Sequence, residues 1–378
     1  MIAVSALLKI RQIQRDSQAQ RQRSHLQQME GRVVMTTPVT NTIGLRNKEE
    51  SGAYGVPVVD LRQQKEAIVA EIRHACQVWG FFTVTGHGID KDTFAKVLEA
   101  ADGVLSLPLQ DKMKLKAKEK GVVRGYMVYH GQLLDETTQT EPDRKEGFDF
   151  GEQFPADGSL GAADLPDKYE LFYADNIWPD ENQLPGFKQA VLTYQQQVRA
   201  LGKRLTGYVS LAMGLPESFM ADHAKHSPSL LRLLKYAAIK SLPEEGRVGC
   251  GAHTDWGLLT LLKTDGSGGL EIKPRWSDSW VEVAEPTDDC IIVNLGDMLQ
   301  RWSNDVFVST PHRVIIKQDR VRYSIPFFIN ADPMATVECV PTFHSAERPP
   351  RYPPVHVGEY LINKTLTHAR NGAHEGDD

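Results

Sequence analysis

Apolar residues recur every three or four positions along residues 186–213, and this spacing predicts the longest helix of the chain. The apolar stripe consists of Phe187, Val191, Tyr194, Val198, Leu201, Leu205, Tyr208 and Ala212. Gly214 and Pro216 follow, as is usual beyond the end of a helix. At 1.5 Å per residue such a helix spans about 40 Å, so we expect a large sheet to cover its apolar face.

The residues before this helix predict alternating strands and helices. Residues 56–59 indicate a strand, residues 63–79 a helix, residues 80–89 a strand with a glycine turn, and residues 91–120 a second helix. Residues 121–184 are rich in Gly, Pro, Asp and Tyr and have weak periodicity. We expect this segment to be mostly loop with short elements, and to form a lid or part of a substrate pocket.

Short apolar segments separated by Gly, Asp and Pro follow from about residue 230. The predicted strands are "LLRLLKYAAI", "LLTLLK", "GLEI", "SWVEV", "CIIVNL", "RVIIK" and "RYSIPFFI". Several short strands at close spacing are typical of a barrel or sandwich. Residues after about 365 are polar, and we expect them to fray.

Composition and charge limit the partners and the cellular compartment that can be expected for the chain. The net charge of −6 gives no general attraction to nucleic acid, and no apolar run is long enough to cross a bilayer. The four cysteines are far apart and form no CxxC pair, which favours a reducing, cytoplasmic compartment over a disulfide framework. We expect a monomer that acts on a small molecule.

The first 48 residues carry eight basic and two acidic side chains and are rich in Gln and Ser. Such a segment cannot bury enough apolar surface to fold alone, so residues 1–54 are expected to be a disordered tail. An organellar presequence is the alternative, because no acidic residue precedes Asp16.

The candidate chemistry begins in "GAHTDWGLLTLL", where His253 and Asp255 are two residues apart. On a strand these side chains would share one face, and burying both is costly unless a cation binds them. His312 in "STPHRVIIK" is the candidate third ligand. Two histidines and one carboxylate form the facial triad of non-haem iron(II) sites. Zinc with three protein ligands and one water is the competing interpretation.

Two further residues favour iron with an organic co-substrate. Arg322 and Ser324 in "RYSIPFF" also share a strand face, and no acidic residue of the chain is an obvious partner for a buried Arg322. A guanidinium binds a carboxylate through two hydrogen bonds, so one end of a dicarboxylate could meet this pair while the other chelates the metal. A hydrolytic zinc site has no evident use for them.

The sequence resembles the iron(II)/2-oxoglutarate-dependent dioxygenases, in the branch that includes isopenicillin N synthase. The matching segments are "VPVVDL", "WGFFTVTGHGI", "HTDWGLLTLL", "VNLGDMLQRWSNDVFVSTPHRV" and "RYSIPFF", in the order of the family. The resemblance implies a double-stranded β-helix (jelly-roll) barrel in a mainly β protein with helices. It also implies that His253, Asp255 and His312 bind iron.

The resemblance further implies that Arg322, Ser324 and Tyr236 bind 2-oxoglutarate. Many members have Asn two residues before this tyrosine and Pro after it, where this chain has Leu234 and Ala237. The expected reaction uses dioxygen, with ascorbate as a candidate reductant, to hydroxylate, desaturate or cyclise a small metabolite, releasing succinate and CO2. Two alternatives are an iron oxidase of the same fold that uses no 2-oxoglutarate, as in isopenicillin N synthase, and a non-catalytic ligand-binding barrel.

The resemblance divides the chain into five parts. These are a tail at 1–54, an amino-terminal region with substrate loops at 55–184, the supporting helix and connection at 185–228, the iron and 2-oxoglutarate barrel at 229–332, and a carboxy-terminal segment and tail at 333–378.

Other polar residues compete for a functional role. His223 and His226 could share a helix face, but they lack a third ligand, so exposed histidines are expected there. His87 lies between glycines and is expected in a structural turn. Gly296 and Asp297 are expected to form a tight turn. The remaining candidates could face substrate or simply pack, and they are Arg124, Tyr126 and Tyr129.

Overall fold

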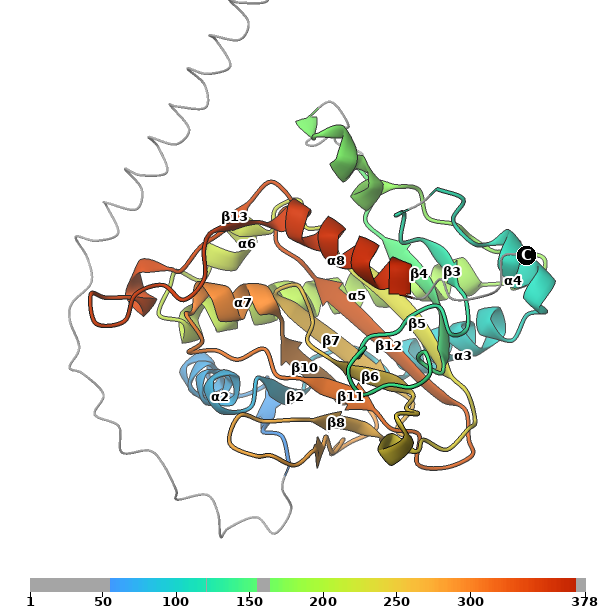
Figure 1. Cartoon of the computed structure of the whole chain (residues 1–378), viewed down its shortest axis with the longest axis horizontal. Coiled ribbons are helices and arrows are strands. Elements are labelled where there is room, and N and C mark those ends of the chain that lie inside the picture. The colour runs from blue at the N-terminus through green and yellow to red at the C-terminus, as the bar shows by residue number, and fades with distance from the viewer. Residues whose placement is uncertain (1–54, 120, 155–163, 372–378) are drawn as a thin grey trace, which may run out of the picture. The chain divides into compact units, whose positions relative to one another are not determined.

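The strands form one large sheet and one small sheet in the computed structural model, which describes residues 55–119, 121–154 and 164–371. The large sheet has the strand order β1-β2-β10-β7-β12-β5-β4-β3 (Figure 1). Only its β1–β2 pair is parallel. Its strands are β1 Val58–Asp60, β2 Phe81–Thr85, β10 Ile291–Leu295, β7 Leu259–Thr264, β12 Arg322–Ile329, β5 Leu230–Tyr236, β4 Lys145–Gly151 and β3 Gly125–Met127.

The small sheet has the order β6-β11-β8-β9 and packs against the large one. Apolar residues of both sheets meet in a shared core, which includes Phe81, Leu234 and Ile292 from the large sheet and Ile272 and Val314 from the small one. The strands of the small sheet are β6 Cys250–His253, β11 His312–Val314, β8 Leu270–Ile272 and β9 Val281–Glu282. A separate pair joins β13 Thr336–Val337 to β14 Val355–His356.

Helices cover the outer side of the large sheet and the ends of the fold (Figure 1). The α-helices are α2 Lys65–Val78, α3 Lys91–Leu105, α4 Leu109–Lys114, α5 Phe187–Ala212, α6 Phe219–His223, α7 Asp297–Trp302 and α8 Val357–Asn371. Short 3-10 turns are η2 Asp167–Tyr173, η3 Pro243–Glu245 and η4 Pro341–Phe343. None of these helices is both long and apolar enough to span a membrane.

Helix α5 confirms the long helix predicted from periodicity. It begins after Gly186 and is followed by Gly214, and both glycines have positive φ. The predicted stripe is buried except for Tyr208, which is partly exposed. Gly202 lets α5 approach the sheet closely, because a Cβ there would lie 2.4 Å from Cδ1 of Ile329 in β12. The sheet therefore has a rigid support on the face away from the small sheet.

Two predictions about local structure were wrong. The helix expected over 91–120 divides into α3 and α4 at Pro108, because proline lacks an N–H and disfavours helical geometry in the residue before it. The described residues of the segment 121–184 are mostly loop with short elements, as expected, and two of these elements, β3 and β4, join the large sheet. Helix α8 continues past residue 365 to Asn371, where fraying was expected.

The predicted tail at 1–54 lies outside the described residues, so the presequence remains a hypothesis. The described residues between 55 and 371 fall within one compact unit. The division into the parts 55–184, 185–228, 229–332 and 333–378 stays a prediction about function, since strands from the first and third parts belong to the same sheet.

Candidate active site

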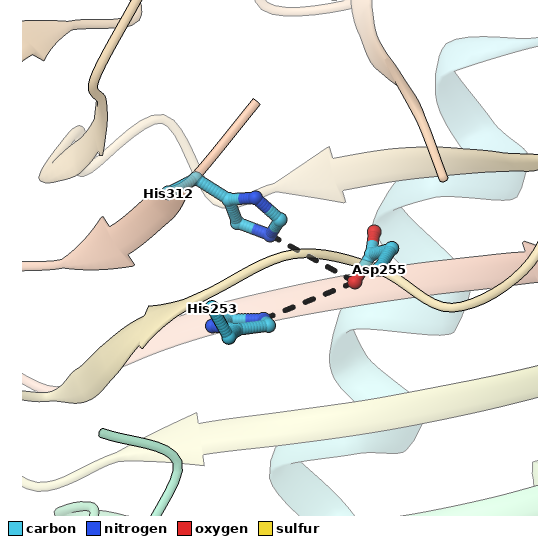
Figure 2. A group of neighbouring side chains, drawn as sticks. All are labelled: His253, Asp255 and His312. Carbon is cyan, nitrogen blue, oxygen red and sulfur yellow. Dashed lines mark ion pairs between the residues drawn. The ribbon is translucent and has the colours of Figure 1, made fainter. Parts of the chain in front are cut away.

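His253 and His312 lie side by side on two neighbouring strands of the small sheet. His253 is the last residue of β6, His312 is the first residue of β11, and the two are direct partners in the antiparallel ladder. Their ring centroids are 4.3 Å apart. The sequence suggested that Asp255 lies on the same strand as His253, but it lies in the connection after β6. The same-face argument was therefore wrong in detail, although the structure brings the pair together (Figure 2).

The three side chains form a cluster that could hold a metal ion. The Nε2 atom of each histidine lies 3.8 Å from Oδ1 of Asp255, and the three ligand atoms lie within 4.8 Å of one another. No other group of three such residues occurs in the part of the chain that the structure describes. His223 and His226 do not join such a group, and His223 is half-buried instead of exposed.

Hydrogen bonds fix the ligand atoms that face the cluster. Nδ1–H of His253 donates to the carbonyl of Gly251 at 2.8 Å, and Nδ1–H of His312 donates to the carbonyl of Thr310 at 3.2 Å. Both Nε2 atoms are thus left unprotonated, on the side of the rings near Oδ1 of Asp255. Orientation of this kind by outer partners is typical of metal sites.

The carboxylate of Asp255 is oriented by the large sheet. Its Oδ2 accepts hydrogen bonds from Asn294 Nδ2 of β10, at 2.6 Å, and from Thr260 Oγ1 of β7. Oδ1 faces the imidazoles. Sequence reasoning missed Thr260 and Asn294. Asn294 is the single polar residue of β10, and that pattern could have singled it out, whereas Thr260 shares β7 with Lys263 and Thr264 and gives no such signal.

Burial and mutual contact set the charge of the cluster. Burial, together with the neighbouring His253, lowers the pKa of His312 to about 4, and burial also lowers the pKa of His253. Burial alone would raise the pKa of Asp255, but the two imidazoles and the bonds from Thr260 and Asn294 hold it below its usual value. Two neutral imidazoles and one carboxylate are the protonation states that bind a divalent metal.

Arg322 has a buried donor with no partner. It lies opposite Tyr236 of β5, with its guanidinium carbon 4.9 Å from the centre of the tyrosine ring. Its Nε donates to the carbonyl of Gly268 at 2.8 Å, while its Nη1 is buried and makes no hydrogen bond. Ser324, two residues along β12, is also buried. An unpaired buried donor is costly, and a ligand carboxylate would satisfy it.

One cavity of about 1760 Å³ connects these groups. Its wall includes the triad, Arg322, Ser324 and Tyr236, and it extends to residues from the segment 121–134. Phe81 closes the wall beside the triad, with its ring centroid 5.4 Å from that of His312. The cavity therefore has room for an organic co-substrate and a second molecule.

The remaining candidates have mainly structural contacts. Arg124 lines the cavity, but its guanidinium donates to the carbonyls of Val123, Glu152, Phe172 and Ala174.

Tyr126 and Tyr129 also line the cavity, and Tyr126 donates to Glu146 at 2.6 Å. His87 accepts from the backbone N–H of Ile89 and donates to the carbonyl of Asp289, which confirms the structural turn. Gly296 and Asp297 begin α7 in place of the tight turn that was expected.

The fold and the cluster together define a non-haem metal oxygenase of the jelly-roll class. Residues 56–181 match the family described as non-haem dioxygenase in morphine synthesis N-terminal. Residues 228–331 match the 2OG-Fe(II) oxygenase superfamily. The chain belongs to the 2OG-Fe(II) oxygenase superfamily.

Curated relatives and solved structures agree with this family. The chain is 34% identical to the 2-oxoglutarate-Fe(II) type oxidoreductase hxnY of Emericella nidulans, over 79% of this chain and 83% of the relative. It is 30% identical to the azadirone synthase LFS of Melia azedarach, over 84% and 94%. The crystal structure of a full-length Neurospora crassa protein in complex with alpha-KG superposes with a TM-score of 0.70 at 27% identity, covering 82% of this chain and 96% of that one.

The comparisons confirm the double-stranded β-helix fold and the enzyme class. The protein is a 2-oxoglutarate-dependent dioxygenase that uses iron(II) and dioxygen to oxidise a small organic molecule. This decides against the zinc hydrolase, the oxidase that uses no 2-oxoglutarate and the non-catalytic barrel.

Proposed function

We propose that His253, Asp255 and His312 hold the iron(II) of this dioxygenase, and that Arg322, Ser324 and Tyr236 bind the distal carboxylate of 2-oxoglutarate. The buried, unpaired Nη1 of Arg322 carries this proposal, because it lines the same cavity as the triad and lacks only an acceptor. Ser324 and Tyr236 flank the guanidinium and offer hydroxyl donors to the same carboxylate.

The charges of the filled site would balance. Iron(II) and Arg322 contribute three positive charges, and Asp255 and the two carboxylates of 2-oxoglutarate contribute three negative charges. A buried site whose charges cancel avoids most of the penalty of desolvating an unpaired ion. Either ligand alone would leave the cavity charged, which favours binding of the two together.

The side chains would orient the ligands and keep the site dry. Bound iron, 2-oxoglutarate and dioxygen supply the oxidising chemistry, with release of succinate and CO2. Thr260 and Asn294 hold one oxygen of Asp255 so that the other faces the metal. Phe81, which is fully buried, restricts water beside His312.

Succinate release tests these roles. Purified protein is mixed in air with iron(II), ascorbate and 2-oxoglutarate, and succinate is measured over time. We expect His253→Ala to abolish release, and Arg322→Ala to raise the half-saturating 2-oxoglutarate concentration about tenfold or more. Arg313→Ala is the matched control, since Arg313 pairs with Glu271 outside the cavity. Unchanged release in both site variants would reject the assignment.

We also propose that the protein is a cytoplasmic monomer that binds neither nucleic acid nor membranes. Four free, buried cysteines suit a reducing compartment, and the net charge of −6 disfavours nucleic acid. All six site residues come from one chain, so the site requires no second copy. Size-exclusion chromatography with light scattering should give the mass of a single chain, 42.3 kDa.

A further inference from the structure

A buried lysine lies in the same cavity and has no role in the assignment above. Lys145 begins β4, opposite Tyr236 of β5, which in turn lies opposite Arg322 of β12. It is only 4% exposed, yet it lines the cavity beside the triad. Burying a lysine costs free energy, so a function beyond packing is expected for this side chain.

The ammonium group of Lys145 has two partners. Its Nζ lies 2.8 Å from Oδ2 of Asp143 and donates to Sγ of Cys250 at 3.0 Å. That sulfur lies 4.0 Å from Nδ1 of His253, so Cys250 is the only side chain between the lysine and this proposed metal ligand along this chain of contacts. An ammonium has three N–H groups. Within the described residues, one N–H of Lys145 is left without a partner.

Asp143 keeps the lysine charged without adding net charge to the cavity. Burial disfavours the charged form of both groups, but the attraction between the two opposite charges outweighs it. The pKa of Asp143 is therefore lowered and the pKa of Lys145 is raised. The pair is therefore an ion pair that is neutral overall. It can offer an acceptor a charged hydrogen bond without disturbing the charge balance of the iron site.

We propose that the free N–H of Lys145 binds the carboxylate next to the keto group of 2-oxoglutarate, at the metal end of the co-substrate. Arg322, Ser324 and Tyr236 serve the other carboxylate, whereas Lys145 is the cation beside Cys250 and His253. Leu234, which also lines this wall, offers no side-chain donor. This inference rests on the proposed function and extends it to the second carboxylate.

A purely structural role for Lys145 would act through Asp143. The carboxylate of Asp143 accepts from the backbone N–H of Gly251 at 2.9 Å, and the carbonyl of Gly251 accepts from His253. If Lys145 only held this chain of contacts in place, its loss would weaken metal binding. If it binds the co-substrate, its loss would weaken binding of 2-oxo acids to protein that is already metal-loaded.

The test compares wild type with the double variant Asp143→Asn/Lys145→Met. The double variant removes the ion pair as a unit, so the net charge of the cavity is unchanged and the ammonium group is lost, while the asparagine amide can still accept from the backbone N–H of Gly251. Iron(II) affinity is measured first without oxygen. Affinity for 2-oxoglutarate and for 2-oxobutyrate, which lacks the distal carboxylate, is then measured from the visible absorption of the iron(II) chelate. If the double variant does not fold, Lys145→Met is compared with wild type in the same way.

We expect the double variant to bind iron(II) within about threefold of wild type and to bind both 2-oxo acids about tenfold or more weakly. Equal binding of the 2-oxo acids by the double variant and wild type would overturn the inference, as would loss of iron(II) binding or weakening confined to 2-oxoglutarate. If wild-type protein fails to bind 2-oxoglutarate, the proposed function itself fails.

Discussion

Asn294 donates a hydrogen bond of 2.6 Å to Oδ2 of Asp255 and thereby fixes the carboxylate between two histidines. Replacing Asn294 with alanine should weaken metal binding about 10- to 100-fold, the usual effect of losing such an outer partner. Titration with manganese(II), followed by paramagnetic resonance, measures this affinity. Asn304→Ala is the control, because Asn304 is also buried but bonds to the carbonyls of Phe343 and Pro349. Equal affinities in the two variants would contradict the role of Asn294.

Arg322→Met should separate stability from co-substrate binding. The substitution removes the unpartnered Nη1 together with the Nε bond to Gly268, and these two effects offset each other in part, so the free protein should lose little stability. In metal-loaded wild type, 2-oxoglutarate at a hundred times its Kd should add about 2.7 kcal/mol to the free energy of unfolding. Thermal melts with and without 2-oxoglutarate should show this gain in wild type only, and a similar gain in the variant would argue against Arg322 as the anchor.

Gly296→Ala should damage both fold and site. A Cβ at Gly296 would lie 2.3 Å from the backbone oxygen of Gly257, close to the connection that bears Asp255. We expect a loss of about 1–3 kcal/mol in the free energy of unfolding, because backbone atoms must move. Gly103→Ala in α3 is the control, since its nearest neighbour, Leu184 Cδ2, is 3.3 Å away. Urea denaturation of both variants decides whether the close approach matters.

Metal loading should stabilise the protein through the triad. Divalent metal should raise Tm in wild type, a chelator should reverse the rise, and His312→Ala should abolish it, because a bound ligand stabilises only the state that binds it. His87→Ala is expected to lower Tm through its own lost contacts but to keep the metal-dependent rise. A rise that persists in His312→Ala would place the metal elsewhere.

The sequence was sufficient to select the three residues that the structure brings together, but not all of their surroundings. Arg322 and Ser324 lie on one face of a single strand, so the two-residue period predicted their proximity. Asn294 and Thr260 reach Asp255 from different strands. Their contacts depend on a sheet order that no local pattern encodes.

Strand β4 was missed because its cavity-facing residues are polar. Lys145 and Asp149 line the cavity, where they pair with Asp143 and Arg232, while Phe148 and Phe150 pack near Phe187 of α5. With ion pairs on the inner face and two glycines in seven residues, "KEGFDFG" lacks the composition of a core strand.

The positions of the three proposed ligands would give a bound metal a mechanical role. His253 and His312 belong to the small sheet, whereas Asp255 is held by Thr260 and Asn294 of the large sheet. A metal bound by all three would act as a cross-link between the two halves of the barrel. Without metal, the contact between the two sheets should open locally more often. Amide hydrogen exchange in β6 and β11 should therefore slow when the metal binds.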